Sequence, residues 1–340
     1  MRAWLPDARG HRRLFSALSI DALGTGLFLP FSILYFTATT DLTLGRVGLA
    51  LSIAALVRIP ATPGAGMFCD RFGARNTVVV SNLTQAVGFF NYLLVDSFGH
   101  LDTSGDTHAV SVNATPERHA PSAHASTSGW ASALRDRPFL GFVVLNFGLA
   151  LLSLAFGLGV PVFLVDTVHL PPWMPGTVLA VNAVLGAAGA TPVGAAITGR
   201  SRSGSLMASQ AIVGCAFLAV LCCAYVPSAF GVGLALAAVV LVTLGELIQS
   251  LIMSPIVNDC ATAASRGRCN SLSQMAFSIG DVVTPALTTT LLAHGPAAAW
   301  IPLAALATVN MLGIALLTNH LPAMRRRVNH PAPTEADSRG

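Results

Sequence analysis

Residues 64–75 read Gly-Ala-Gly-Met-Phe-Cys-Asp-Arg-Phe-Gly-Ala-Arg, a short charged turn between two long apolar runs. Gly73 permits a tight turn, because glycine adopts backbone conformations that other residues avoid. Arg71 and Arg75 favour the cytoplasmic side for this turn, since positively charged residues that flank membrane spans stay in the cytoplasm. The pattern predicts two membrane helices joined by a cytoplasmic loop.

The whole chain has the composition of a membrane protein. Apolar residues make up 53% of its 340 residues, charged residues only 10%, and the mean hydropathy is +0.67. Soluble domains carry about 25% charged residues, so this chain lacks the charge to cover a water-facing surface. A soluble protein with an unusually apolar core is the alternative, but its charges would interrupt the apolar runs every ~10 residues.

The apolar runs predict about nine transmembrane helices, because a single span in lipid must satisfy its backbone polar groups within a helix. They form two groups separated by a polar stretch that cannot bury a core. We expect a basic cytoplasmic N-terminus at 1–13, a three-helix membrane segment at 14–95, a polar disordered linker at 96–137, a six-helix membrane domain at 138–318 and a basic disordered tail at 319–340. The candidate spans are 14–36, 45–67, 76–95, 138–165, 173–198, 205–225, 230–257, 271–293 and 296–318.

The charge pattern indicates topology and not a partner made of nucleic acid. The net charge is +4, all of the basic side chains besides histidine are arginines, and most of these arginines lie in short loops and tails. Such a distribution places the N-terminus and the C-terminal tail in the cytoplasm of a multi-pass protein in the lipid bilayer of the cell membrane. The six cysteines form no C-x-x-C pair, which favours buried small hydrophobes over a metal or disulfide framework.

The two groups of spans disagree about the side of the linker. Three crossings from a cytoplasmic N-terminus place Asp96 outside the cell. The arginines of the second group, beginning with Arg135 and Arg137, instead place the end of the linker inside. An odd number of crossings is therefore missing between the two groups.

Asp21 lies inside the first candidate span, where a carboxylate is expensive and is usually kept for function. Thr25 and Tyr35 share its helix face, so the three residues form a polar stripe that could face a cavity. We interpret Asp21 as a candidate for proton coupling. The alternative is an ion pair with Arg58 on the next span, which would offset the cost of burying both charges.

Glu246 and Asp281 are the other carboxyl groups predicted inside spans, and both are candidates for proton coupling. Gln249 lies on the face of Glu246, and Gln274 lies on the face of Asp281, so each pair could line a cavity. The alternative for both is a hydrogen bond between helices, since polar side chains also hold membrane helices together.

Three more residues inside spans are candidates for contact with a solute. Asn146 and Asn182 lie on the polar faces of the fourth and fifth spans, where packing between helices is the alternative. Arg58 lies about two turns before the cytoplasmic end of its span, so it could equally extend to the membrane interface. We find no phosphate-binding loop, no His-Glu-x-x-His and no Ser-His-Asp arrangement, so the sequence predicts neither an enzyme nor a metal site.

The turn Asp70-Arg71-Phe72-Gly73-Ala74-Arg75 resembles the signature between the second and third helices of the major facilitator superfamily of transporters. Residues 138–318 resemble the six-helix second half of that family. Arg200-Ser201-Arg202 falls where the family has its loop between helices eight and nine, and Arg266-Gly267-Arg268 falls between helices ten and eleven. Residues 14–95 resemble helices one to three, so we expect a truncated first half in which the family's helices four to six have no counterpart.

The resemblance implies an all-α membrane protein with a major-facilitator-like helical bundle that carries a small solute by secondary transport. We expect proton-coupled efflux of a drug-like or metabolite molecule, with the proton gradient as energy source and no cofactor. Proton-coupled uptake is one alternative, and an internally deleted remnant or membrane partner protein without transport is another. The resemblance also implies that Gly66, Asp70, Arg71, Gly73 and Arg75 form a cytoplasmic gate loop. The sequence predicts no particular oligomeric state.

Overall fold

The computed structural model describes residues 33, 35–37, 43–56, 74–92, 137–171, 173–260 and 266–328, and their regular elements are helices. The helices are Leu44–Leu56, α3 (Ala74–Tyr92), α6 (Arg137–Asp166), α7 (Met174–Ile197), α8 (Arg202–Cys222), η1 (Cys223–Tyr225), α9 (Ser228–Cys260), α10 (Arg266–Ala293), α11 (Pro296–His320) and α12 (Pro322–Arg325). The prediction of an all-α protein is confirmed.

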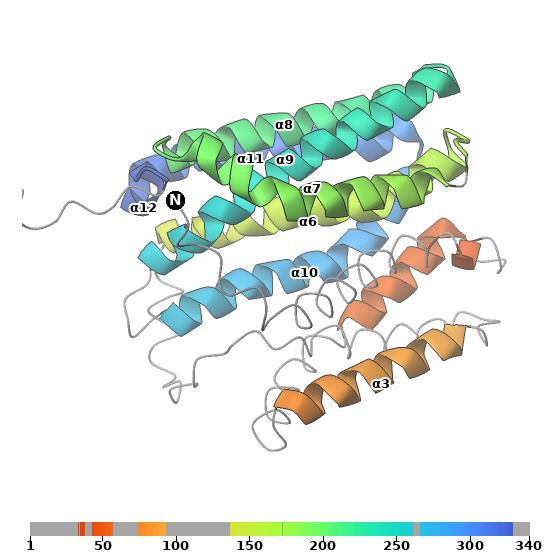
Figure 1. The fold of residues 1–340 in the computed structure, drawn as a ribbon, viewed down its shortest axis with the longest axis horizontal. Coiled ribbons are helices and arrows are strands. Elements are labelled where there is room, and N and C mark those ends of the chain that lie inside the picture. The colour runs from red at the N-terminus through yellow and green to blue at the C-terminus, as the bar shows by residue number, and fades with distance from the viewer. Residues whose placement is uncertain are drawn as a thin grey trace, which may run out of the picture.

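The helices α6 to α11 form a bundle of long, nearly parallel rods (Figure 1). Within the described part of the chain, these six helices are long and apolar enough to cross a membrane. They coincide with the last six predicted spans to within a few residues. The second and third predicted spans are represented by the apolar helix Leu44–Leu56 and by α3. Most of the first, 14–36, lies outside the described residues.

Helix α6 lies at the centre of the bundle. Within its apolar window 78% of the residues are buried, compared with 17% in α7. The core around α6 is built on Trp300, whose ring meets Phe163 edge-on with centroids 5.2 Å apart and stacks on Phe217 at 5.9 Å. Aromatic pairs of this geometry contribute about 0.5–1.5 kcal/mol beyond the area that they bury. The core therefore joins α6, α8 and α11.

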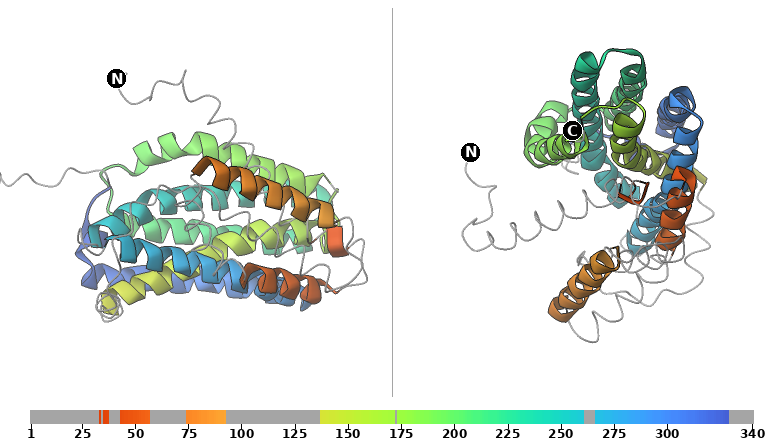
Figure 2. Two further views of the ribbon diagram at one scale, coloured as in Figure 1. Left: turned by 90° about the horizontal axis from the view of Figure 1, so that it is seen from below. Right: turned by 90° about the vertical axis from the view of Figure 1, so that its right-hand side faces the viewer.

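The helix Leu44–Leu56 belongs to the first predicted group of spans, yet it lies against α6 and α10 of the second (Figures 1 and 2). Its buried side chains form an apolar cluster with two residues of α6: Val47, Ala50, Leu51, Leu158 and Val162. Helix α3 lies on the same side of the bundle, set apart from α10 (Figure 1).

The two groups of helices show the topological conflict that the charges predict. Helix α3 ends at one end of the bundle, and α6 begins at the other (Figures 1 and 2). Residues 93–136, which join these two helices, lie outside the described residues. The predicted linker therefore stays a prediction.

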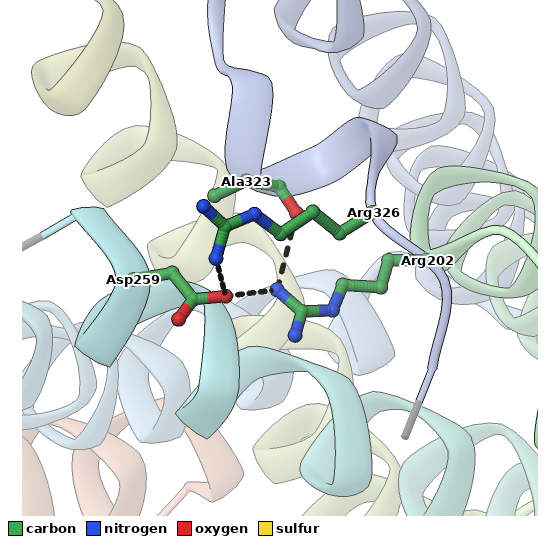
Figure 3. Close-up of polar contacts among 4 residues, drawn as sticks. All are labelled: Arg202, Asp259, Ala323 and Arg326. Carbon is green, nitrogen blue, oxygen red and sulfur yellow. Dashed lines mark hydrogen bonds and ion pairs between the residues drawn. The ribbon is translucent and has the colours of Figure 1, made fainter. Parts of the chain in front are cut away.

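One end of the bundle, which we call the basic end, carries Arg200, Arg202 and Arg325–Arg327. Here a carboxylate at the end of α9 joins two arginines: Asp259 Oδ2 lies 2.6 Å from an Arg202 guanidinium nitrogen and 3.2 Å from one of Arg326 (Figure 3). Arg202 also donates a hydrogen bond to the Ala323 carbonyl at 3.1 Å. Asp259 therefore ties α8 and α9 to the segment that follows α11.

That segment, residues 321–328, differs from the disordered tail predicted from residue 319. Val328 N–H donates to the Arg200 carbonyl at 2.9 Å, and Gly199 N–H donates to the Val328 carbonyl at 3.0 Å. Four of its side chains are buried in the apolar cluster at the basic end: Leu321, Ala323, Met324 and Val328. The arginines suggested a solvated tail, but the apolar residues between them hold the segment against α8 and α9.

We expect Asp259→Asn to lower the melting temperature of the detergent-solubilised protein by about 2–4 °C. The reason is that the side chain of Arg202 is only 11% exposed, and a nearly buried charge without its partner is destabilising. Thermal unfolding followed by fluorescence or light scattering measures the change. The exposed Arg200→Gln, which also changes the charge at this end by one unit, should leave the melting temperature almost unchanged. Equal melting temperatures for Asp259→Asn and the parent would contradict the role of the ion pairs.

Candidate functional site

A cavity of about 520 Å³ lies between α6, α7, α9 and α10. A site of this kind, with a few polar groups among apolar walls, is the usual form of a small-molecule pocket. Its polar lining residues are Asn146, Ser153, Asn182, Thr243, Glu246, Gln249, Ser250, Ser254, Ser273 and Gln274. Its other lining residues are Gly186, Leu247, Met253, Val257 and Phe277.

Helix α9 supplies the longest wall of the cavity. Its lining residues recur three or four positions apart from Thr243 to Val257, which is the spacing that places side chains on one face of a helix. Val257 lies one turn before α9 ends at the basic end. The cavity therefore extends from the middle of the bundle toward the basic end.

Glu246 is the carboxyl group in this lining. Ser153 on α6 donates a hydrogen bond to its Oε1, so the carboxylate has a fixed polar partner on the facing helix. A charge inside a membrane costs about 2.5–3.5 kcal/mol on insertion scales, and the hydroxyl offsets part of that cost. This pair gives the cavity a group that can hold or release a proton.

The two asparagines have different surroundings. Asn146 is 1% exposed, and its amide nitrogen lies 3.0 Å from both the carbonyl and the hydroxyl oxygen of Ser273 on α10. It therefore connects α6 to α10 and supports the wall of the cavity. Asn182 lies partly exposed on α7, with its Oδ1 3.2 Å from the hydroxyl oxygen of Thr243. Its amide is the more accessible to a solute.

The structure brings five of the predicted site residues together around one cavity: Asn146, Asn182, Glu246, Gln249 and Gln274. Asp281 lies on α10 two turns beyond Gln274 and is not among the lining residues. Tyr35 is 42% exposed, packs edge-on against Phe36 with ring centroids 5.3 Å apart, and does not line the cavity either.

The remaining candidates from the first half lie outside the described residues or are described only in part. Arg75 belongs to the first turn of α3, but its side chain is not described. The others are outside the described ranges altogether: Asp21, Thr25, Arg58, Gly66, Asp70, Arg71 and Gly73. The ion pair between Asp21 and Arg58 and the gate loop therefore stay predictions.

Several lining residues were not singled out by the sequence. Thr243 and Ser254 lie on the face of Glu246 at helical spacing, so extending that face by one turn in each direction would have found them. Ser273 and Phe277 lie on α10, where the polar face was assigned around Asp281. Gly186 has no side chain, so it carries no polar signal in the sequence, and its place in the cavity wall follows only from how α7 packs.

Comparison with known proteins gives one family. The model of the Major Facilitator Superfamily matches residues 105–285, just over half of the 340-residue chain. No curated protein matches the sequence. The match covers α6 to α9 and most of α10, and so includes all of the residues that line the cavity. Members of this family are membrane transporters and not enzymes. The chain belongs to the major facilitator superfamily.

Proposed function

We propose that this transporter exports a small drug-like or metabolite molecule in exchange for protons. The observation that carries the proposal is the cavity between membrane-crossing helices, with the carboxyl group of Glu246 in its wall. Ionisable groups inside membrane spans commonly mark the paths of ions and substrates. Asn182, Gln249 and Gln274 provide hydrogen-bonding groups for a solute, while the apolar lining residues accommodate its hydrocarbon parts.

Glu246 has the role of the proton-binding group in this proposal. A proton that reaches the carboxylate removes its charge, so the wall alternates between a charged and a neutral state. Ser153 holds the carboxylate toward α6 and stays a donor to it in the charged state. A proton that crosses a membrane potential of ~100 mV supplies ~2.3 kcal/mol before any pH gradient is counted. That energy drives accumulation of the solute on the far side.

The arginines assign a side of the membrane to each end of the bundle in the proposal. Positively charged residues beside spans prefer the cytoplasm, which assigns the basic end to the cytoplasmic side. The cavity extends toward this end, where the exported solute of our proposal enters from the cytoplasm. Uptake would use the same residues in the opposite sense and would be recognised by the direction of net flux.

The other predicted residues enter the proposal as secondary parts. Asp21 and Asp281 are further candidates for proton binding outside this cavity wall. The loop that contains Gly66, Asp70, Arg71, Gly73 and Arg75 restrains one conformation of the transport cycle at the cytoplasmic side. The carboxylate of Asp70 is the reason, because it is attracted to the partial positive charge at a helix N-terminus.

Proton flux in proteoliposomes tests the function directly. Vesicles that contain the full chain and a trapped pH-sensitive dye are given an outward or inward proton gradient, and ethidium serves as the first probe from a panel of drug-like cations and neutral molecules. Coupled movement of ethidium or another panel member with protons supports the proposal. Proton leak equal to that of empty liposomes across the whole panel would favour the non-transporting alternative.

A further inference from the structure

A groove of about 380 Å³ lies between α8 and α11 and shares no lining residue with the cavity. Leu218 of α8 and Ile301 of α11 line it and are 47% and 51% exposed, so it opens on the outer face of the bundle. Its floor is made of small side chains, since a Cβ atom added to Gly214 of α8 would lie 3.5 Å from the Cβ of Ala307 on α11. Both helices are long and apolar enough to cross a membrane. This α8–α11 groove therefore faces lipid.

Gln210 is a polar residue in the lining of the groove and is only 1% exposed. Its Oε1 accepts a hydrogen bond from the amide nitrogen of Asn310 on α11 at 3.3 Å. In the part of the chain that the structure describes, the amide nitrogen of Gln210 itself has no acceptor. A donor that is buried without a partner is unfavourable. The groove therefore offers a hydrogen bond to an acceptor oxygen on a molecule that occupies it.

Both walls of the groove continue to the basic end of the bundle. On α8, Gly204 lies seven residues before Ala211, and on α11, Thr318 lies seven residues after Met311. This spacing keeps residues on one face of a helix. Arg325 is fixed where the α11 wall ends, because its Nε donates to the Thr318 carbonyl at 2.9 Å. Its guanidinium group therefore lies at the foot of the groove.

Arg200 lies at the foot of the other wall, in the turn that leads into α8. Arg200 and Arg325 are both exposed, and neither forms an ion pair among the described residues. The carboxylate of Asp259 pairs with Arg202 and Arg326 instead. Uncompensated positive charge therefore remains where the groove meets the membrane surface. Arginines in this position attract anionic lipid headgroups.

The length of this face corresponds to one leaflet of a bilayer. Leu218, at the far end of the α8 wall, lies 14 residues beyond Gly204, which is about 21 Å along the helix axis. Half of a bilayer, with its headgroup region, is about 20–22 Å thick. A phospholipid whose phosphate lies at the arginines would therefore extend an acyl chain along the whole groove.

We propose that the α8–α11 groove binds one phospholipid with a negatively charged headgroup, in the leaflet around the basic end. Arg200 and Arg325 hold the phosphate, Gln210 donates to an ester carbonyl, and an acyl chain lies on the floor around Gly214. A second copy of the chain fits the groove less well. In the same membrane orientation it would bring its own basic end beside this one, and like charges repel. The site does not depend on the proposed transport activity.

Native mass spectrometry of the detergent-solubilised full chain tests the site. Phosphatidylglycerol and phosphatidylcholine with the same acyl chains are added in separate titrations, and the first phosphatidylglycerol should bind about fivefold tighter or better. Arg325→Gln should weaken phosphatidylglycerol binding about fivefold and leave phosphatidylcholine binding unchanged. Ala305→Phe places a ring in the groove from an exposed position on α11. It should weaken the first phosphatidylglycerol by about fivefold or more, because the acyl chain loses its contacts.

Two matched variants serve as controls and should bind phosphatidylglycerol as the parent does. Ala237→Phe makes the same enlargement at an exposed position of α9 that lines neither the groove nor the cavity. Arg46→Gln removes an exposed arginine from the helix Leu44–Leu56, away from the basic end. Equal affinity of the parent for the two lipids, or parent-like phosphatidylglycerol binding by Arg325→Gln or Ala305→Phe, overturns the proposal. A dimer of the parent that Ala305→Phe dissociates would also overturn it, since a second copy would then cover the groove.

Discussion

Replacing Glu246 by Gln is expected to reduce proton-coupled solute flux by more than about tenfold in proteoliposomes. Glutamine has nearly the same shape and can still accept the hydrogen bond from Ser153, so the wall of the cavity should be preserved. It cannot bind and release a proton, so a solute that still enters the cavity no longer exchanges for one. The measurement is ethidium movement driven by a proton gradient, compared with ethidium binding to the same protein in detergent.

Two other variants distinguish a loss of proton coupling from a general loss of stability or activity. Asp259→Asn removes a carboxylate outside the cavity, at the basic end, and should retain the flux even though it lowers stability. Ser153→Ala leaves Glu246 ionisable and should reduce the flux by a few-fold at most, about the effect of one hydrogen bond. Proton-coupled flux within twofold of the parent in Glu246→Gln would contradict the assignment and direct attention to Asp281 and Asp21.

Filling the cavity at Gly186 is expected to abolish transport without unfolding the protein. Gly186 lies in the cavity wall on α7, and a Cβ atom built there meets no heavy atom within 4 Å. The ring of Gly186→Phe therefore has room to enter the cavity and occupies space that a solute needs. Glycine is the weaker helix former of the two by a few tenths of a kcal/mol, so the melting temperature should not fall. We expect flux below about one tenth of the parent's, since the ring excludes the solute from its site.

Gly233→Phe provides the control for this prediction. Gly233 lies on α9, outside the cavity lining, and its added Cβ also meets no heavy atom within 4 Å. The same enlargement in open surroundings should leave both transport and melting temperature close to those of the parent. Normal transport by a well-folded Gly186→Phe variant would show that solutes do not use this cavity.

The sequence predicted the six long helices well, because each apolar run is long enough to span a bilayer and is bounded by charged or Gly/Pro-containing loops. It also predicted part of the site. Glu246 and Gln249 share a helix face, and that face lines the cavity. Periodicity within one helix could not show that Asn182 would meet Thr243 or that Ser153 would meet Glu246, because these pairs depend on how separate helices pack.

Packing also explains the two places where the sequence was least informative. The polar face around Asp281 suggested a cavity residue, and Gln274 and Phe277 on that face do line the cavity, but Asp281 lies one turn beyond Phe277, past the end of the lining. The segment after α11 contains three consecutive arginines, a pattern typical of solvated tails. The spacing of Leu321, Met324 and Val328, which recurs every three or four residues, was the signal for its buried face.

Helices α6 and α7 are buried to very different extents, and this difference determines where the bundle opens locally first. Amide hydrogens exchange with solvent through local openings, whose free energy falls where few side chains are buried. Helix α6, at the centre, should keep its amide hydrogens longest among the six long helices, and α7, of whose apolar window only 17% is buried, should lose them early. Helix α7, which carries Asn182 and Gly186, is therefore the most easily displaced of the cavity walls. Its movement can widen or narrow the cavity with little disturbance of the aromatic core around Trp300.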